Sequence, residues 1–233
     1  MSDAAKINAA RAALDFIEDG MIVGLGTGST AAHFVTLLGE RVKQGLRIQG
    51  VATSVATEKQ AALLNIPLMA LDLADIVHVD VDGADEIDPN FRLIKGGGGA
   101  LLREKMVAEV SKRMVVIADK SKAVKALGAF PLPIEIVPFG TRLTTARVCD
   151  VLTACGATWK QVGIRLANGK PFVTDGGNFI LDAETEGFPD PELLADALKR
   201  TTGVVEHGLF LGVAETVILG SDDGVTVKSS RAL

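Results

Sequence analysis

Carboxylates, a lysine and four consecutive glycines are gathered in one short stretch of this 233-residue chain. The stretch runs from Asp80 to Lys105 and reads DVDGADEIDPNFRLIKGGGGALLREK. Carboxylates can remove and return protons, and a lysine beside backbone N–H groups can stabilise a negative charge on oxygen. The stretch contains neither histidine nor cysteine, so its acid–base chemistry would fall to carboxylates and lysine.

Two aspartates and the lysine–glycine run are the parts of this stretch best suited to a ligand. Asp82 and Asp85 lie around a glycine turn that can direct both carboxylates to one point, and Lys95 precedes glycines whose N–H groups can approach an anion. A solvated acidic turn is the alternative, because D-G and P-N are common turn dipeptides. It does not explain residues 96–99, since four glycines in succession are entropically costly to order.

A second candidate site follows the first short apolar run. Residues 24–40 read GLGTGSTAAHFVTLLGE, which predicts a strand, a glycine turn and a helix. In that arrangement backbone N–H groups and the helix dipole converge on an anion. Thr27, Ser29 and Thr30 add hydroxyl groups, which suits a terminal phosphate ester. A purely structural strand-to-helix turn is the alternative.

The same turn also matches the dinucleotide fingerprint in its alanine-ended form, Gly26-x-Gly28-x-x-Ala31. That fingerprint expects an acidic residue at the end of the next strand, about 20 residues on, to hold the ribose hydroxyls. The next predicted strand, 46–52, is followed by Thr53 and contains no such carboxylate. Dinucleotide binding is therefore the weaker interpretation.

Alternating strand and helix patterns predict a parallel sheet that would position both sites. Ligands of open α/β sheets bind at the carboxyl ends of the strands, where these loops are expected. Lys120 and Lys122 follow another predicted strand, so one of them could reach an anion at the same edge. We predict strands at 21–23, 46–52, 74–79 and 114–118, and helices at 4–18, 54–64 and 99–111.

From Phe130 onward the pattern changes to that of an α+β lobe. We expect a Rossmann-like open-sheet domain made of residues 1–129 and 204–233, with residues 130–203 inserted as a smaller lobe. The β-rich sequence after Gly203 is expected to rejoin the first sheet. Within the lobe we predict helices at 141–154 and 190–200 and strands at 158–163, 172–173 and 179–182.

Composition excludes several functional classes. A hydrophobic content of 48% excludes disorder, and a net charge of −5 without a basic block argues against partners such as nucleic acid or anionic membranes. The N-terminal residues carry acids and helical periodicity, and there is no 18-residue apolar span, so we expect a cytoplasmic protein. Cys149 and Cys155 lack metal-ligand spacing, and we expect no metal site.

Six motifs in order identify a family. GLGTGSTA, ATS, DGADEID, KGGGGALLREK, ADKSK and GVVEHGLF closely resemble the type A ribose-5-phosphate isomerases over essentially the whole chain. The resemblance implies interconversion of D-ribose 5-phosphate and D-ribulose 5-phosphate in the pentose phosphate pathway. It also implies a homo-oligomer, a homodimer or homotetramer, that works without metal or organic cofactor.

The resemblance assigns roles residue by residue. The family's proton acceptor matches Glu104, and aldose–ketose isomerisation does need one base that moves a proton between carbon 2 and carbon 1 through an enediolate. Lys95 with glycine N–H groups could stabilise the oxyanion, while Asp82 and Asp85 could exchange protons with the sugar oxygens. The substrate-binding residues implied are Thr27, Gly28, Ser29, Thr30, Asp82, Gly83, Ala84, Asp85, Lys95, Gly96, Gly97, Gly98 and Lys122.

Two other functional classes remain as alternatives. A sugar-phosphate-sensing domain of a transcription regulator can share this fold, but residues 1–20 contain no basic helix-turn-helix. A coenzyme A transferase or sugar-phosphate deaminase could also place a carboxylate near a glycine loop. Both explain the combination of Glu104 and the DGADE turn less well.

Overall fold

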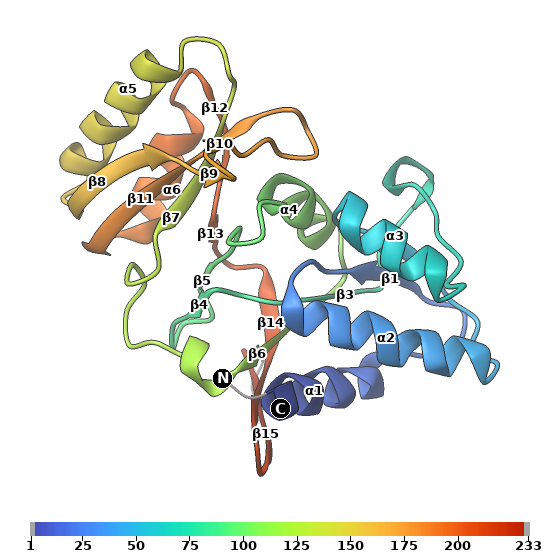
Figure 1. The fold of residues 1–233 in the computed structure, drawn as a ribbon. Helices are drawn as coiled ribbons and strands as arrows, with labels where there is room; N and C mark the ends of the chain where they lie inside the picture. The colour runs from blue at the N-terminus through green and yellow to red at the C-terminus, as the bar shows by residue number, and fades with distance from the viewer. Residues whose placement is uncertain (1–2, 231–233) are drawn as a thin grey trace. The chain divides into compact units, whose positions relative to one another are not determined.

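The computed structural model of the chain describes residues 3–230, and the terminal residues of the expected open-sheet domain lie outside this range. The chain divides into two compact units (Figure 1). The first comprises Met1–Ala84, Arg103–Ala123 and Gly212–Leu233, and the second comprises Asp85–Leu102 and Val124–Leu211. The second unit thus contains the expected lobe together with residues 85–102, 124–129 and 204–211.

The first unit is built on a six-stranded sheet with the order β15-β14-β6-β3-β1-β2. All neighbouring strands are parallel except β14 and β15, which confirms the predicted α/β open sheet. Strand β2 lies on one side of β1 and β3 lies on the other, so the direction in which strands are added reverses at β1. The carboxyl ends of β1 and β3 therefore flank the topological switch point. The strands are β1 Ile22–Leu25, β2 Gln49–Ala52, β3 Val79–Asp82, β6 Met114–Asp119, β14 Ala214–Ser221 and β15 Gly224–Ser229.

Helices pack on both faces of this sheet. On one face α1 and α2 lie side by side (Figure 1), and Phe34 and Leu38 of α2 pack on Val23 and Leu25 of β1. On the other face Val107 of α4 packs with residues of the neighbouring segments. The helices are α1 Asp3–Ala13, α2 Ser29–Lys43, α3 Val55–Leu63 and α4 Leu101–Glu109, with short 3-10 turns η1 Leu14–Phe16, η2 Leu71–Leu73 and η3 Lys120–Lys122.

Strand β3 lies later in the chain than predicted. The apolar run 74–79 has strand length, but Val77 packs with Val107 of α4 and the paired strand begins only at Val79. The predicted strand 74–79 is therefore wrong, and Asp80 and Asp82 belong to the strand itself. Both aspartates are fully buried. Val79 and Val81 join the core beneath α1 and α2, so alternation turns the two aspartates toward the face covered by α4.

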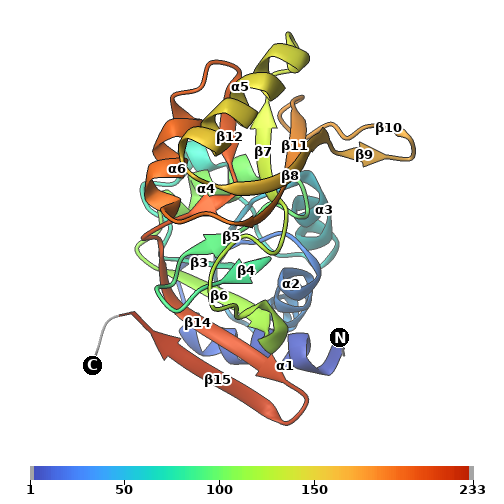
Figure 2. The same ribbon diagram turned by 90° about the vertical axis from the view of Figure 1, so that its left-hand side faces the viewer.

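The second unit contains a four-stranded antiparallel sheet with the order β12-β7-β11-β8. Helices α5 and α6 share one core with it, in which Val148 and Leu194 pack with Ile134 and Leu181. A small β9–β10 hairpin extends from the sheet (Figure 2). The elements are β7 Leu132–Ile136, α5 Thr141–Ala154, β8 Thr158–Ile164, β9 Leu166–Ala167, β10 Lys170–Pro171, β11 Phe179–Gly187, α6 Pro191–Lys199 and β12 Val204–His207, with a three-stranded sheet of β4 Glu86–Ile87, β5 Leu93–Ile94 and β13 Leu209–Phe210.

One sequence prediction for this part of the chain is wrong, and another is confirmed only in part. The expected strand 172–173 is absent from the described chain, and the β9–β10 hairpin forms just before it. In the β-rich sequence after Gly203, residues 204–210 do not rejoin the first sheet, because β12 pairs with β7 and β13 pairs with β5. Strands β14 and β15 both belong to the six-stranded sheet, and the expected return to that sheet is confirmed at β14. The predicted helix 141–154 is confirmed to the residue.

Candidate active site

The loop after β1 is joined to the end of β3 by close backbone contact. A Cβ on Gly26 would lie 2.2 Å from Asp82 Oδ1 and 2.6 Å from Asp82 Cα, so only glycine fits there. The amide of Thr27 donates to Asp82 Oδ1 at 3.0 Å, and the amide of Gly83 donates to the same oxygen at 2.6 Å. The structure therefore brings together two of the predicted segments, the glycine turn and the DGADE turn.

The Thr27 hydroxyl is held by side chains of the ATS motif. Its Oγ1 lies 2.8 Å from the hydroxyls of both Thr53 and Ser54, and 3.2 Å from that of Thr57. Ser54 also accepts a hydrogen bond from the Thr57 amide and so caps the start of α3. Sequence patterns did not indicate this network, because hydroxyl residues near a helix start are ordinary caps. It fixes the turn that leads into α2.

The start of α2 has the geometry of an anion site. Gly28 is its N-cap with a φ of 111°, and among the described residues no side-chain hydrogen bond caps this helix end and nothing lies within 4 Å of where a Cβ on Gly28 would be. Ser29 is exposed, and Thr30 is half-buried. The free N–H groups and positive dipole end of a helix stabilise a phosphate placed there.

Glu104 lies on the side of α4 that faces the sheet. Val107 of the same helix lies 2.8 Å from where a Cβ on Gly24 would be, and Glu104, three residues earlier, shares that side of the helix. Because α4 leads into β6, which is parallel to β3, the helix runs antiparallel to the strands. Glu104 is therefore nearer than Val107 to the carboxyl end of β3, where Asp82 lies. Its exposed fraction is only 3%.

Lys122 follows β6 at the same edge of the sheet. It ends the 3-10 turn η3, in which the Asp119 carboxylate accepts hydrogen bonds from the amide and the hydroxyl of Ser121. Strand β6 is the direct neighbour of β3. Lys122 therefore comes from the loop beside the one that carries Asp82.

In the second unit Asp85 is bound to the glycine run. Its Oδ2 accepts a hydrogen bond from the Gly97 amide at 2.7 Å, and a Cβ on Gly97 would lie 2.7 Å from Oδ1. Gly96 is buried, whereas Gly97 and Gly98 are exposed. The structure thus places Asp85 of the acidic turn in contact with the glycine run.

Lys95 is buried beside the GVVEHGLF segment. Only 2% of it is exposed, and its Nζ lies 5.4 Å from the centroid of the Phe210 ring, in cation–π geometry. The Lys95 amide donates to the Gly208 carbonyl, and a Cβ on Gly208 would lie 2.3 Å from the Lys95 carbonyl oxygen. These partners come from a distant part of the chain, which sequence patterns could not connect to Lys95.

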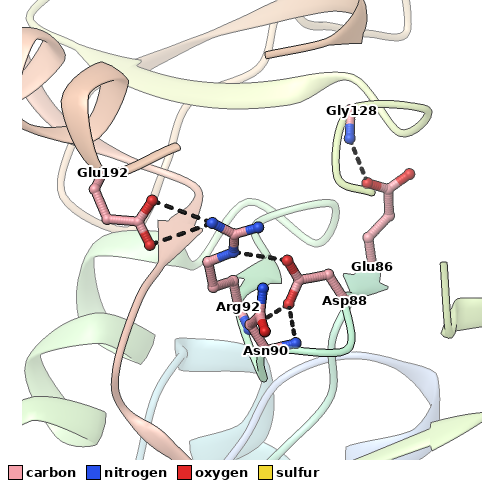
Figure 3. Close-up of polar contacts among 6 residues, drawn as sticks. All are labelled: Glu86, Asp88, Asn90, Arg92, Gly128 and Glu192. Atoms are coloured by element: carbon pink, nitrogen blue, oxygen red, sulfur yellow. Dashed lines mark hydrogen bonds and ion pairs between the residues drawn. The ribbon is translucent and has the colours of Figure 1, made fainter. Parts of the chain in front are cut away.

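Other carboxylates of the stretch are structural (Figure 3). Glu86 accepts a hydrogen bond from the Gly128 amide at 2.7 Å. Asp88 binds Arg92 Nε at 2.6 Å, and Arg92 also pairs with Glu192 of α6 at 3.2 Å. Burial of the Arg92 guanidinium opposes its charged form, but the hydrogen bonds and charges of Asp88 and Glu192 raise its pKa above the ordinary value. These interactions stabilise the β4–β5 hairpin.

The two cysteines are not among the predicted site residues. Cys149 lies within α5 and is a partly buried free thiol, whereas Cys155 lies at the end of α5 and is a buried free thiol, and burial raises the pKa of each. Within residues 3–230, no three His, Cys, Asp or Glu side chains are grouped so that they could hold a metal ion. In the same range, no helix has the length and apolar character needed to cross a membrane.

The predicted residues divide between the two units. Thr27, Gly28, Ser29, Thr30, Asp82, Gly83, Ala84, Glu104 and Lys122 belong to the first, while Asp85, Lys95, Gly96, Gly97 and Gly98 belong to the second. The chain links the two sets directly, since Ala84 is followed by Asp85.

Comparison with known proteins gives one consistent result. The sequence pattern of Ribose 5-phosphate isomerase A (phosphoriboisomerase A) matches residues 49–224. A Ribose-5-phosphate isomerase A from Nitrobacter hamburgensis is 53% identical over 229 residues, which cover 98% of this chain and 99% of that protein. The structure of a ribose 5-phosphate isomerase from Plasmodium falciparum is 36% identical with a TM-score of 0.92, and the match covers 100% of both chains. A D-ribose-5-phosphate isomerase structure in complex with phospho-erythronic acid is 39% identical with a TM-score of 0.90, covering 98% of this chain and 100% of that one.

Proposed function

The chain belongs to the ribose 5-phosphate isomerase A family and interconverts D-ribose 5-phosphate and D-ribulose 5-phosphate, and we propose that Glu104 is the general base of this reaction. One observation carries the proposal. Glu104 is a buried carboxylate on the sheet-facing side of α4, toward the strand end that holds Asp82. The match to isomerases over the whole chain favours this activity over a sugar-phosphate-sensing domain or a coenzyme A transferase.

The proposed reaction moves one proton between two carbons. Glu104 removes the proton on carbon 2 of the open-chain aldose, and the electron pair of that C–H bond forms the carbon–carbon double bond of an enediolate, with the negative charge on oxygen 1. Glu104 then returns the proton to carbon 1. The hydroxyl proton on oxygen 2 moves to oxygen 1, which leaves the ketone at carbon 2.

Lys95 and the glycine N–H groups are the proposed stabilisers of the charged oxygen. The Lys95 ammonium is buried, and a charge acts more strongly where water is excluded. The Gly97 amide is engaged by Asp85, so we assign the backbone donor to the exposed Gly98. Asp82 and Asp85 exchange protons with the sugar oxygens in this proposal.

The phosphate is proposed to bind at the start of α2, with Lys122 nearby. Changing Ser29, Thr30 or Lys122 singly to alanine should raise the Michaelis constant for the phosphorylated sugar. A charge-assisted hydrogen bond is worth roughly 1.5–3 kcal/mol, so a loss on the order of tenfold or more is expected for each contact made. Steady-state kinetics checks this, with Lys43→Ala at the other end of α2 as control. Unchanged Michaelis constants in all three variants would show that the phosphate binds elsewhere.

The reaction is proposed to need no metal. Activity should survive exhaustive dialysis against a chelator, because Lys95 and backbone N–H groups can stabilise the enediolate that a metal would otherwise stabilise. A coupled assay for ribulose 5-phosphate formation, run with and without chelator, tests this. Inactivation that a divalent ion reverses would show instead that carboxylates of the DGADE turn are metal ligands.

We further propose that the enzyme works in the cytoplasm as a homodimer or homotetramer within the pentose phosphate pathway. Two free cysteines fit a reducing compartment, and the family resemblance implies a homo-oligomer. Size-exclusion chromatography with light scattering would give the oligomeric state, and a monomeric mass would contradict that part of the proposal.

A further inference from the structure

The glycine loop, defined as residues 95–99, is held by a side chain that sequence patterns did not indicate. Arg165 lies between β8 and β9 in the same unit as the loop. Its Nη1 donates to the carbonyl oxygen of Gly96 at 2.8 Å and to that of Gly97 at 3.1 Å. One guanidinium therefore binds two successive peptide groups of the loop, and only 15% of the Arg165 side chain is exposed.

Arg165 is itself fixed in place. Asp182 of β11 binds it through two hydrogen bonds, from Nε at 2.9 Å and from Nη2 at 2.5 Å. The backbone is also bound on both sides, since the Arg165 amide donates to the Ile180 carbonyl and the Arg165 carbonyl accepts from the Phe172 amide, each at 2.8 Å. A bidentate carboxylate fixes the plane of a guanidinium, so the remaining nitrogen points in a defined direction.

These bonds set which way the loop amides point. In a planar trans peptide the C=O and the following N–H point in opposite directions. The bond from Arg165 to the Gly96 carbonyl therefore turns the Gly97 N–H away from Arg165, and this N–H meets Asp85. The bond to the Gly97 carbonyl turns the Gly98 N–H away in the same manner.

The loop needs such external bonds to stay ordered. Gly96 and Gly99 have φ angles of 102° and 83°, and four glycines in succession lose more conformational freedom than any other residues when they are fixed. A turn bond of 3.0 Å joins the Gly99 amide to the Gly96 carbonyl. The Phe172 ring lies 2.5 Å from where a Cβ on Gly99 would be, so it packs directly on the loop.

We propose that Arg165, oriented by Asp182, is a positioning residue that presets the glycine loop for oxyanion stabilisation. This inference rests on the role proposed above for Lys95 and Gly98. Donors that are already aimed when charge develops stabilise a transition state without reorganisation. Arg165 acts through the loop and is not proposed to contact the substrate.

The experiment compares Arg165→Ala, Arg165→Lys and the control Arg200→Ala. Arg200 also pairs with an aspartate in the same unit, but its side chain is 81% exposed and its partner is Asp196 of α6. Two quantities are measured for each variant, the kinetic constants and the hydrogen–deuterium exchange of the peptide that contains residues 95–99. Thermal unfolding shows whether each variant is folded at the assay temperature.

In Arg165→Ala we expect the loop amides to exchange faster and kcat to fall by roughly 10- to 100-fold, because misplaced catalytic groups cost about that much. The Michaelis constant should change less, since the proposed phosphate contacts are at Ser29, Thr30 and Lys122. Arg165→Lys should show the same pattern, because an ammonium cannot bind Asp182 and both carbonyls at once. Arg200→Ala should match the wild type.

Unchanged loop exchange in Arg165→Ala would overturn the positioning role. A loss of thermal stability with normal kcat and normal loop exchange would also overturn it, because it would leave Arg165 with a merely structural role. Faster loop exchange with unchanged kcat would contradict a different claim, the catalytic role of the loop itself.

Discussion

The Glu104→Gln variant is expected to fold normally and to lose isomerase activity by about 10²–10⁴-fold, the usual contribution of a positioned general base. Glutamine has nearly the same shape as glutamate and can still form hydrogen bonds, so the packing of α4 on the sheet should persist. It cannot accept a proton from carbon 2 at neutral pH. The loss should therefore appear in kcat, measured by the coupled assay for ribulose 5-phosphate formation.

A matched control is available on the same helix. Glu109 is the last residue of α4 and is exposed, whereas Glu104 is 3% exposed. Glu109→Gln makes the same chemical change away from the sheet, and it should retain wild-type activity. Circular dichroism and thermal unfolding should be alike for both variants. A Glu104→Gln variant as active as Glu109→Gln would show that Glu104 is not the general base.

Asp82→Asn is expected to produce the second large loss, on the order of 10²-fold, by slowing the opening of the sugar ring. Ribose 5-phosphate is mainly a closed ring, whereas ribulose 5-phosphate cannot close a furanose through its phosphorylated oxygen. Asparagine keeps an oxygen that can accept from the Thr27 and Gly83 amides, so the loop contacts should remain. The side chain can no longer take up and release a proton.

The loss in Asp82→Asn should appear in both directions of the reaction, because the equilibrium constant ties the forward and reverse rates together. Steady-state rates measured from ribose 5-phosphate and from ribulose 5-phosphate check this. Asp75→Asn, at an exposed position of the same unit, is the control for the change of charge. Wild-type rates in both directions would show that Asp82 takes no part in the reaction.

Local features of the fold could be predicted from the sequence because neighbouring residues determine them. Helix α5 begins after Gly140 and ends before Gly156, both with positive φ, and its bounds were predicted to the residue. The α/β class depends on similarly short strand and helix patterns. The β3 strand was misplaced because its buried residues include Asp80 and Asp82, and charged side chains argue against a buried strand.

Contacts between distant segments could not be predicted. The sequence indicated that Lys95 and its glycines form a site, but neither Phe210 beside Lys95 nor Arg165 on the loop carbonyls follows from spacing. Strand β12 shows the same limit, because periodicity identifies a strand without identifying its partner. The pairing of β12 with β7 depends on which sheet edge is open in the folded chain.

We propose that Glu104 moves the carbon-bound proton, whereas Asp82 assists the opening of the sugar ring. The most direct test is the exchange of a carbon 1 proton of ribulose 5-phosphate with deuterated solvent, followed by NMR, because this exchange needs the enediolate but never the closed ring. Asp82→Asn is expected to retain much of the wild-type exchange rate, and Glu104→Gln is expected to lose it. Wild-type exchange in Glu104→Gln, or equally deep loss in both variants, would contradict this division of roles.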